Sequence, residues 1–188
     1  MLTPPVPTPF NLHHMPPKSG SAWPDRIYDV FVRERIRQVA YVPDAGHSRL
    51  IERCQADHRM KVVVLTTEEE GIGVLAGAWL GGDRGALLMQ SSGVGNCINM
   101  LSLATVCRFP LLMLVTMRGE WGEFNPWQIP MGHGTPPILE QAGVLVYRLS
   151  APEAAEETVE AAARIVFNGD RAAAVLISQR VIGAKSFK

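Results

Sequence analysis

The sequence predicts a doubly wound α/β fold, in which helices cover both faces of a parallel sheet of about six strands. Short apolar runs of strand length recur along the chain, and helical patterns separate them, as in successive βαβ units. The run 110–116 is almost wholly apolar, which is typical of a central parallel strand. We find no internal repeat and no second domain, so residues 23–188 are expected to form a single domain.

Six runs have the length and composition of strands. The second is apolar and β-branched, which favours a buried strand. Turn residues at 43–46 follow the first of these runs. The predicted strands cover residues 39–42, 61–65, 86–89, 110–116, 144–149 and 172–178.

Helical patterns fill the intervals between the strands. The first begins at Trp23, with Pro24 in the first turn, where proline is tolerated. A glycine-rich turn at 92–96 leads into another helix, and Thr135 opens a later one after a long irregular loop at 119–134. The predicted helices cover residues 23–38, 47–59, the stretch after Glu68, the stretch that ends near Phe109, the stretch from Thr135, and 151–167.

Composition excludes several classes of protein. The 18 basic and 18 acidic residues cancel, so nothing supports nucleic acid or a membrane surface as a partner, and a neutral apolar chain suits an assembly. No apolar run approaches the roughly 18 residues of a membrane span, and the proline-rich residues 1–22 predict an extended arm, not a signal peptide. Three cysteines without a Cys-x-x-Cys pair predict buried thiols in the cytoplasm.

Glutamates at 68–70 stand where the second strand ends and a helix begins. That edge of a parallel sheet is where ligands bind, although a helix N-terminus also favours acidic residues for stability alone. Gly71, Gly73 and Gly77 follow, and each weakens a helix by up to about 1 kcal/mol relative to alanine. We infer that side chains are kept away from something packed close to this helix.

This stretch resembles the pyrimidine-binding domain of thiamine diphosphate enzymes, in which a glutamate follows the second strand and a glycine lies nine positions later. Glu68 and Gly77 meet that spacing. The segment 89–96, Met-Gln-Ser-Ser-Gly-Val-Gly-Asn, is similar to the Gln-Asn-Ser-Gly-x-Gly-Asn segment of phosphonopyruvate and sulfopyruvate decarboxylases. Arg118-Gly119 and the segment 131–135 also have counterparts there, so the resemblance spans roughly residues 25–183.

The resemblance implies that Glu68 is the catalytic residue. In that family the glutamate hydrogen-bonds N1′ of the cofactor's aminopyrimidine and favours the tautomer that removes the thiazolium C2 proton, so it must be buried and able to share a proton. The alternative is an exposed acid at a helix start. We interpret Glu69 and Glu70 as structural or interface residues. The glycine-rich loop would line the pyrimidine and substrate side of the pocket. The cofactor-binding residues that the resemblance implies are Glu68, Gln90, Ser91, Ser92, Gly93, Gly95 and Asn96.

Four further residues are candidate substrate ligands. Asp44 and His47 follow the first strand at the ligand edge. Related decarboxylases often have a polar residue at the position of Ala45, so the resemblance implies that any proton-handling role passes to Asp44 or His47, although an exposed loop histidine is usually just solvated. Arg118 and His133 bound the long loop and are suited to pair with an acidic group of the substrate.

The diphosphate-binding motif of these enzymes, Gly-Asp-Gly followed by a later asparagine, does not occur in the sequence. A hard cation needs oxygen ligands, and we identify no metal site here. The resemblance therefore implies a partner β subunit that holds Mg²⁺ and the diphosphate of thiamine diphosphate. The active site would lie at the interface of a hetero-oligomer such as α2β2.

We therefore expect the α subunit of a thiamine diphosphate-dependent decarboxylase that acts on a small 2-oxo acid. A first alternative is a carboligase or lyase of the acyloin type, which would use the same Glu68. A non-catalytic regulatory or scaffolding subunit and a stand-alone nucleotide-binding module are alternatives of other classes.

Overall fold

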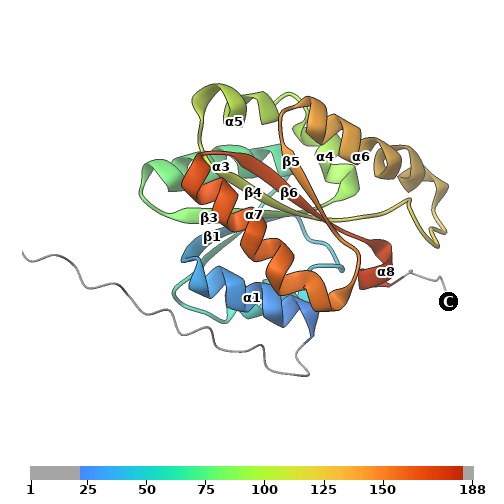
Figure 1. Ribbon diagram of the computed structural model, residues 1–188, viewed down its shortest axis with the longest axis horizontal. Coiled ribbons are helices and arrows are strands. Elements are labelled where there is room, and N and C mark those ends of the chain that lie inside the picture. The colour runs from blue at the N-terminus through green and yellow to red at the C-terminus, as the bar shows by residue number, and fades with distance from the viewer. Residues whose placement is uncertain (1–21, 184–188) are drawn as a thin grey trace, which may run out of the picture.

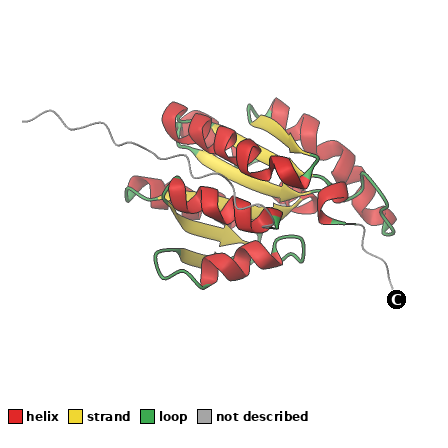
Figure 2. Ribbon diagram, turned by 60° about the horizontal axis from the view of Figure 1, so that its bottom comes forward, coloured by secondary structure: helices red, strands yellow, loops and turns green. Residues whose placement is uncertain are grey.

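Six strands form one parallel sheet, which helices cover on both faces (Figures 1 and 2). The computed structural model describes residues 22–183, so the predicted arm lies outside the described residues except for its last one. The strands are β1 (Ile36–Tyr41), β2 (Lys61–Val64), β3 (Arg84–Gln90), β4 (Leu111–Thr116), β5 (Leu145–Leu149) and β6 (Ala172–Ile177). They pair in the order β2-β1-β3-β4-β6-β5, which confirms the predicted fold class.

Two groups of helices enclose the sheet. The helices are α1 (Trp23–Arg33), α2 (Ser48–Gln55), α3 (Glu68–Leu80), α4 (Ser91–Cys97), α5 (Leu101–Cys107), α6 (Ile129–Gln141), α7 (Ala155–Gly169) and α8 (Gln179–Ile182). Short 3-10 turns, η1 (Pro126–Gln128) and η2 (Pro152–Ala154), precede α6 and α7. Helices α1, α2 and α7 form one apolar cluster with one face of the sheet, while α3 to α6 form a second cluster with the other face. β4 and β6 are buried throughout because both faces are covered.

The strand order reverses between β1 and β3. β2 lies on one side of β1, whereas β3 and then β4 lie on the other side. Doubly wound sheets bind ligands outside the carboxyl ends of the strands at such a point. The fold therefore predicts a ligand site beside the carboxyl ends of these two strands, where Asp44 follows β1 and Gln90 ends β3.

The first helix is shorter than predicted. It ends at Arg33 instead of residue 38, because Arg35 has a left-handed backbone with φ of 56°, which a right-handed helix cannot continue. β1 consequently begins at Ile36, three residues before the predicted start. Periodicity missed this boundary because a buried isoleucine fits a helix and a strand equally well.

Residues 92–96 are helical, so the predicted glycine-rich turn is wrong. They lie within α4, which packs against α3 and α6, and this packing overrides the weak helix propensity of glycine.

Helix α6 begins at Ile129, six residues before the predicted start at Thr135, so the loop before it is shorter than predicted. A Cβ at Gly132 would overlap the backbone oxygen of Arg118, so glycine allows α6 to approach the end of β4.

Two expectations about burial are also wrong. β2 is an edge strand, and Val63 and Val64 are 37% and 58% exposed, because an apolar run does not reveal its place in the sheet. Cys107 is exposed, whereas burial raises the pKa of Cys54 and Cys97 to about 12.

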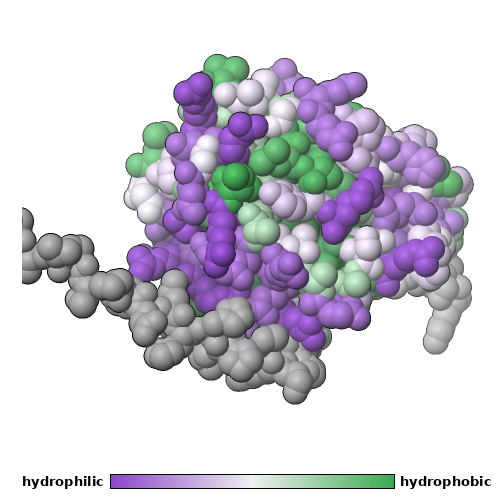
Figure 3. Space-filling view, viewed as in Figure 1, coloured by the Kyte–Doolittle hydropathy of each residue, from purple (hydrophilic) through white to green (hydrophobic). Residues whose placement is uncertain are grey.

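The surface around α1 is mostly hydrophilic, with a small apolar patch near β5 (Figure 3). Within residues 22–183, every helix is too short or too polar to cross a membrane.

Candidate functional site

Glu68 lies at the carboxyl edge of the sheet, as the first residue of α3. The residue is only 8% exposed, and Asn96 of α4 donates a hydrogen bond from Nδ2 to its Oε2 at 2.7 Å. The N-terminus of α3 favours the negative charge of this carboxyl group. Two residues predicted for the cofactor site thus meet across two different helices.

The backbone of α4 approaches the Glu68 carboxyl group so closely that any side chain at residue 93 would clash with it. A Cβ at Gly93 would overlap Cγ, the carboxyl carbon and Oε1 of Glu68. Because that side chain is buried, it has little room to move aside. Gly93 therefore serves the position of Glu68 and is not required for a turn.

One oxygen of Glu68 is open. Among the described residues, Oε2 accepts the hydrogen bond from Asn96, whereas nothing donates to Oε1. Oε1 is nevertheless not among the fully enclosed unpaired atoms, so it keeps some exposure to solvent. A buried carboxyl group with one open oxygen can share a proton with a ring nitrogen. These residues therefore fit the pyrimidine part of thiamine diphosphate.

The two neighbouring glutamates differ from Glu68. Oε2 of Glu70 accepts a hydrogen bond from the backbone nitrogen of Thr66 at 2.8 Å, which satisfies a donor just before α3. Glu69 is exposed. Their geometry suits the structural or interface roles predicted for them.

A second polar cluster lies at the point where the strand order reverses. The Asp44 carboxylate accepts a hydrogen bond from Oγ1 of Thr116 at 2.6 Å and another from Nε2 of Gln90 at 3.1 Å. Oε1 of Gln90 in turn accepts from the Ser92 hydroxyl at 3.1 Å. Because Ser92 and Gly93 are neighbours in α4, this helix connects the second cluster with Glu68.

His47 is completely buried, so the expectation of an exposed loop histidine is wrong. Its Nε2 lies 3.1 Å from the carbonyl oxygen of Leu114, which can only accept, so Nε2 carries the proton. Within the described chain, Nδ1 is buried without a partner. Burial lowers the pKa of His47, and the nearby Asp44 opposes this effect only in part.

Arg118 is paired within the chain. Its Nε and Nη2 donate to the two carboxylate oxygens of Glu123 at 2.6 and 2.5 Å, and both side chains are less than one-tenth exposed. The Arg118 hydrogen bonds lower the pKa of Glu123 from 4.5 to about 2. Gly119, Asn125 and Gln179 donate further hydrogen bonds to the same carboxylate. An acidic substrate group would have to compete with Glu123 for this arginine.

The remaining predicted residues lie in different surroundings. The Ser91 hydroxyl accepts a hydrogen bond from the backbone nitrogen of Arg118 at 3.1 Å and is fully buried. A Cβ at Gly95 would contact the Met131 sulfur at 3.2 Å, which is tight but adjustable. His133 is exposed on α6. Within residues 22–183, no group of three or more His, Cys, Asp or Glu side chains is placed to hold a metal ion.

Sequence reasoning missed Thr116 and Glu123. Thr116 is the polar last residue of an otherwise apolar strand, a signal that points to the ligand edge and could have been used. Glu123 had no such signal, because its role depends on the fold of the loop around it.

The comparison with protein families agrees with this geometry. The family described as "Thiamine pyrophosphate enzyme, N-terminal TPP binding domain" matches residues 24–130, which include Glu68 and both polar clusters. The chain belongs to this family. Thiamine pyrophosphate is another name for thiamine diphosphate, so the cofactor class inferred from the sequence is supported.

Relatives within the family carry related names. "Sulfopyruvate decarboxylase subunit alpha" of Methanococcus maripaludis is 34% identical over 81% of this chain and 92% of its own length. The protein of the same name from Methanothermobacter thermautotrophicus is 38% identical over 72% of this chain and 83% of its own length. "Phosphonopyruvate decarboxylase" of Streptomyces viridochromogenes is 38% identical over 56% of this chain, but the match covers only 27% of that enzyme.

A solved structure shares the fold. A 2-oxoglutarate:ferredoxin oxidoreductase from Magnetococcus marinus superposes with a TM-score of 0.68 over 86% of this chain, at 14% identity. This chain spans 29% of the length of that protein. At this identity the likeness supports the fold alone.

Proposed function

We propose that this chain is the pyrimidine-binding subunit of a heteromeric thiamine diphosphate-dependent decarboxylase that acts on a 2-oxo acid of the sulfopyruvate or phosphonopyruvate type. The observation that carries this proposal is the Glu68 carboxyl group, which is buried at the ligand edge of the sheet with one open oxygen. The names of the relatives support the reaction and the substrate class.

Glu68 has the central part in the proposed mechanism. When bound, thiamine diphosphate supplies the nucleophilic carbon and the electron sink that decarboxylation of a 2-oxo acid needs. Oε1 of Glu68 would share its proton with the pyrimidine nitrogen N1′. Asn96 holds Oε2, and Gly93 leaves room for the carboxyl group. These two residues position the acid, and the surrounding small residues of α4 leave space beside it.

A partner subunit completes the proposed site by holding Mg²⁺ and the diphosphate, in an assembly such as α2β2. The word "alpha" in the relatives' names supports a second type of subunit. The outer face of α3 supports a docking surface, because Cβ atoms added at Gly73 or Gly77 would meet nothing within 4 Å, and Leu80 is 88% exposed. The two glycines leave this face of α3 without side chains, although nothing in the described chain packs on it.

The substrate would lie beside the cofactor at the same edge. Asp44, Gln90 and Ser92 offer acceptors and donors for a polar 2-oxo acid. Arg118 would bind its acidic group only if the pair with Glu123 opens. His133 is exposed on the surface of α6, so it would contact the substrate only if the substrate extends to that surface. His47, which is completely buried near Asp44, would act through that carboxylate.

Substitution of Glu68 by glutamine tests the proposal in the assembly reconstituted with its partner. Glu68→Gln keeps the shape but cannot share a proton in the same way, so we expect turnover of sulfopyruvate or phosphonopyruvate to fall by about 10²- to 10⁴-fold. Release of CO₂ measures turnover. Exchange of the cofactor's C2 proton, followed by NMR, reports the same step without depending on the substrate.

Glu69→Gln is the matched control, because Glu69 is the exposed neighbour in the same helical turn and loses the same charge. It should keep at least half of the wild-type turnover. If Glu68→Gln retains wild-type turnover and C2 exchange, the catalytic proposal is wrong and a scaffolding subunit is the better reading.

A further inference from the structure

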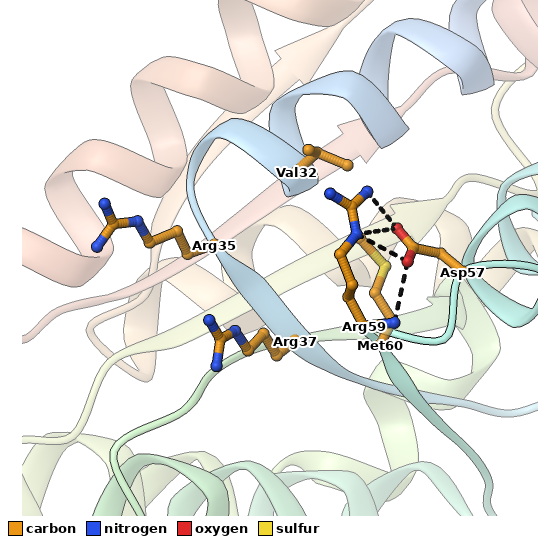
Figure 4. Close-up of a pocket in the computed structure, with 6 residues that line it drawn as sticks. All are labelled: Val32, Arg35, Arg37, Asp57, Arg59 and Met60. Carbon is orange, nitrogen blue, oxygen red and sulfur yellow. Dashed lines mark hydrogen bonds and ion pairs between the residues drawn. The ribbon is translucent and has the colours of Figure 1, made fainter.

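Arginines gather at the opposite edge of the sheet, where β1 and β3 begin. A hollow of about 400 Å³ is lined there by Arg33, Arg35, Arg37, Gly82, Asp83 and Arg84. A second hollow of similar volume shares Arg35 and Arg37 with the first, and its other lining residues are Val32, Asp57, Arg59 and Met60 (Figure 4). Arg35 and Arg37 thus stand between two adjoining hollows.

These two arginines have no carboxylate partner among the described residues. The neighbouring arginines do: the ion pairs are Arg33–Glu156 at 2.8 Å, Arg84–Glu34 at 3.1 Å and Arg59–Asp57 at 2.7 Å. Figure 4 shows Arg59 turned toward Asp57, while Arg35 and Arg37 extend in a common direction away from that pair. Their charges are therefore available to a ligand.

Neither helix capping nor strand burial explains why arginine stands at positions 35 and 37, although capping does explain the neighbouring Arg33. A helix C-terminus favours cations, which accounts for Arg33 in the last turn of α1. Arg37, however, is the one exposed residue of β1, a strand that lies between two others. Arg35 has φ of 56°, a conformation in which glycine would be relaxed and a long side chain is strained.

Charge and size indicate the ligand. Four arginines and one aspartate line the first hollow, but Arg33 and Arg84 are each paired with a glutamate, so the charge open to a ligand is that of Arg35 and Arg37. Guanidinium groups bind phosphate and similar oxyanions through paired hydrogen bonds. The volume lies within the range of small-molecule sites, and the charge is too localised for a nucleic-acid surface.

We propose that this hollow binds a small molecule with two or more adjoining oxyanion groups, such as a diphosphate. Arg35 and Arg37 would each bind one group, with Arg33 and Arg84 at the sides. The site is separate from Glu68, because the six residues of β1 place the two edges about 20 Å apart. The proposal does not depend on the function proposed for Glu68.

Calorimetric titration of the full chain with inorganic diphosphate, at about 0.15 M salt, tests this site. We expect one binding site on the wild-type chain and at least tenfold weaker binding by the Arg35→Gln/Arg37→Gln variant. The control Arg108→Gln/Arg171→Gln removes two exposed arginines outside both hollows, and Arg108 has a similar φ of 53°. It should bind within twofold of wild type.

The single variant Arg37→Gln provides a second test if the double variant does not fold, and it should weaken binding at least threefold. The proposal is overturned if the wild-type chain shows no binding, or if all of these variants bind equally well. A glutamate-rich peptide that binds more tightly than diphosphate would also overturn it, in favour of a protein partner.

Discussion

At the scale of single residues, the site depends on the missing side chain of Gly93 as much as on the carboxyl group of Glu68. Glu68 is buried with one amide partner, and the space for its carboxyl group exists because residue 93 has no side chain. Gly95, two residues later in the same helix, faces a methionine that can adjust. The two glycines of α4 therefore differ in what they permit.

Replacement of Gly93 by alanine should therefore lower the free energy of unfolding by about 1–3 kcal/mol, because the added methyl group overlaps a buried carboxyl group. Gly95→Ala is the control on the same helix, and it should change the free energy of unfolding by less than about 1 kcal/mol because Met131 can shift. Urea denaturation of both variants measures the difference. Equal stabilities would show that Glu68 does not fill the space beside Gly93.

At the scale of elements, α3 has two unlike faces. Its inner face packs on the sheet, where a Cβ at Gly71 would meet Leu87 and Leu65. Its outer face has no side chains at Gly73 and Gly77. Glycine lowers helix stability there, and no contact in the described chain requires it. A close approach by another chain is the reason that we propose.

Gly77 allows stability and assembly to be separated. Gly77→Ala should stabilise the isolated chain by about 0.5–1 kcal/mol, because alanine is the better helix former and meets no clash. Gly77→Leu should fold normally but bind the partner subunit at least tenfold more weakly, as measured by surface plasmon resonance. Glu157→Leu, on the exposed side of α7, is the control for an added leucine. Unchanged binding by Gly77→Leu would place the partner elsewhere.

At the scale of the whole molecule, one buried ion pair joins parts of the chain that are distant in sequence. Glu123 binds Arg118 at the end of β4 and also accepts a hydrogen bond from Gln179 at the start of α8. Gln179 in turn accepts from the backbone of Glu120 and Trp121. This network holds the loop after β4 against the carboxyl end of the sheet.

Acid should weaken the fold through this network. The pKa of Glu123 falls from 4.5 to about 2 on folding, so its contribution is present above about pH 4.5 and is lost as the pH falls toward 2. Glu123→Gln should flatten the pH dependence of stability in this window and cost about 3 kcal/mol at pH 7, because Arg118 loses its buried partner. Thermal and urea unfolding between pH 2 and pH 7 measure both effects. Glu157→Gln, an exposed control, should behave like wild type.

Several boundaries and environments were beyond sequence reasoning. The end of α1 depends on the left-handed Arg35, and the helical state of α4 depends on packing against α3 and α6. The burial of His47 depends on its packing beside β4, where the Leu114 carbonyl oxygen lies 3.1 Å from its Nε2. The first depends on one backbone conformation and the other two on residues that are remote in sequence, and local periodicity predicts neither kind of feature.

The amino-acid sequence by itself determined the alternation of strands and helices, the parallel sheet and the place of Glu68 at its ligand edge, because these depend on residues close together along the chain. Only the tertiary structure decided which polar groups meet. Asn96 reaches Glu68 across 28 residues, and Thr116 reaches Asp44 across 72. Such contacts follow from the register of parallel strands and the packing of helices, which bring distant segments to one edge.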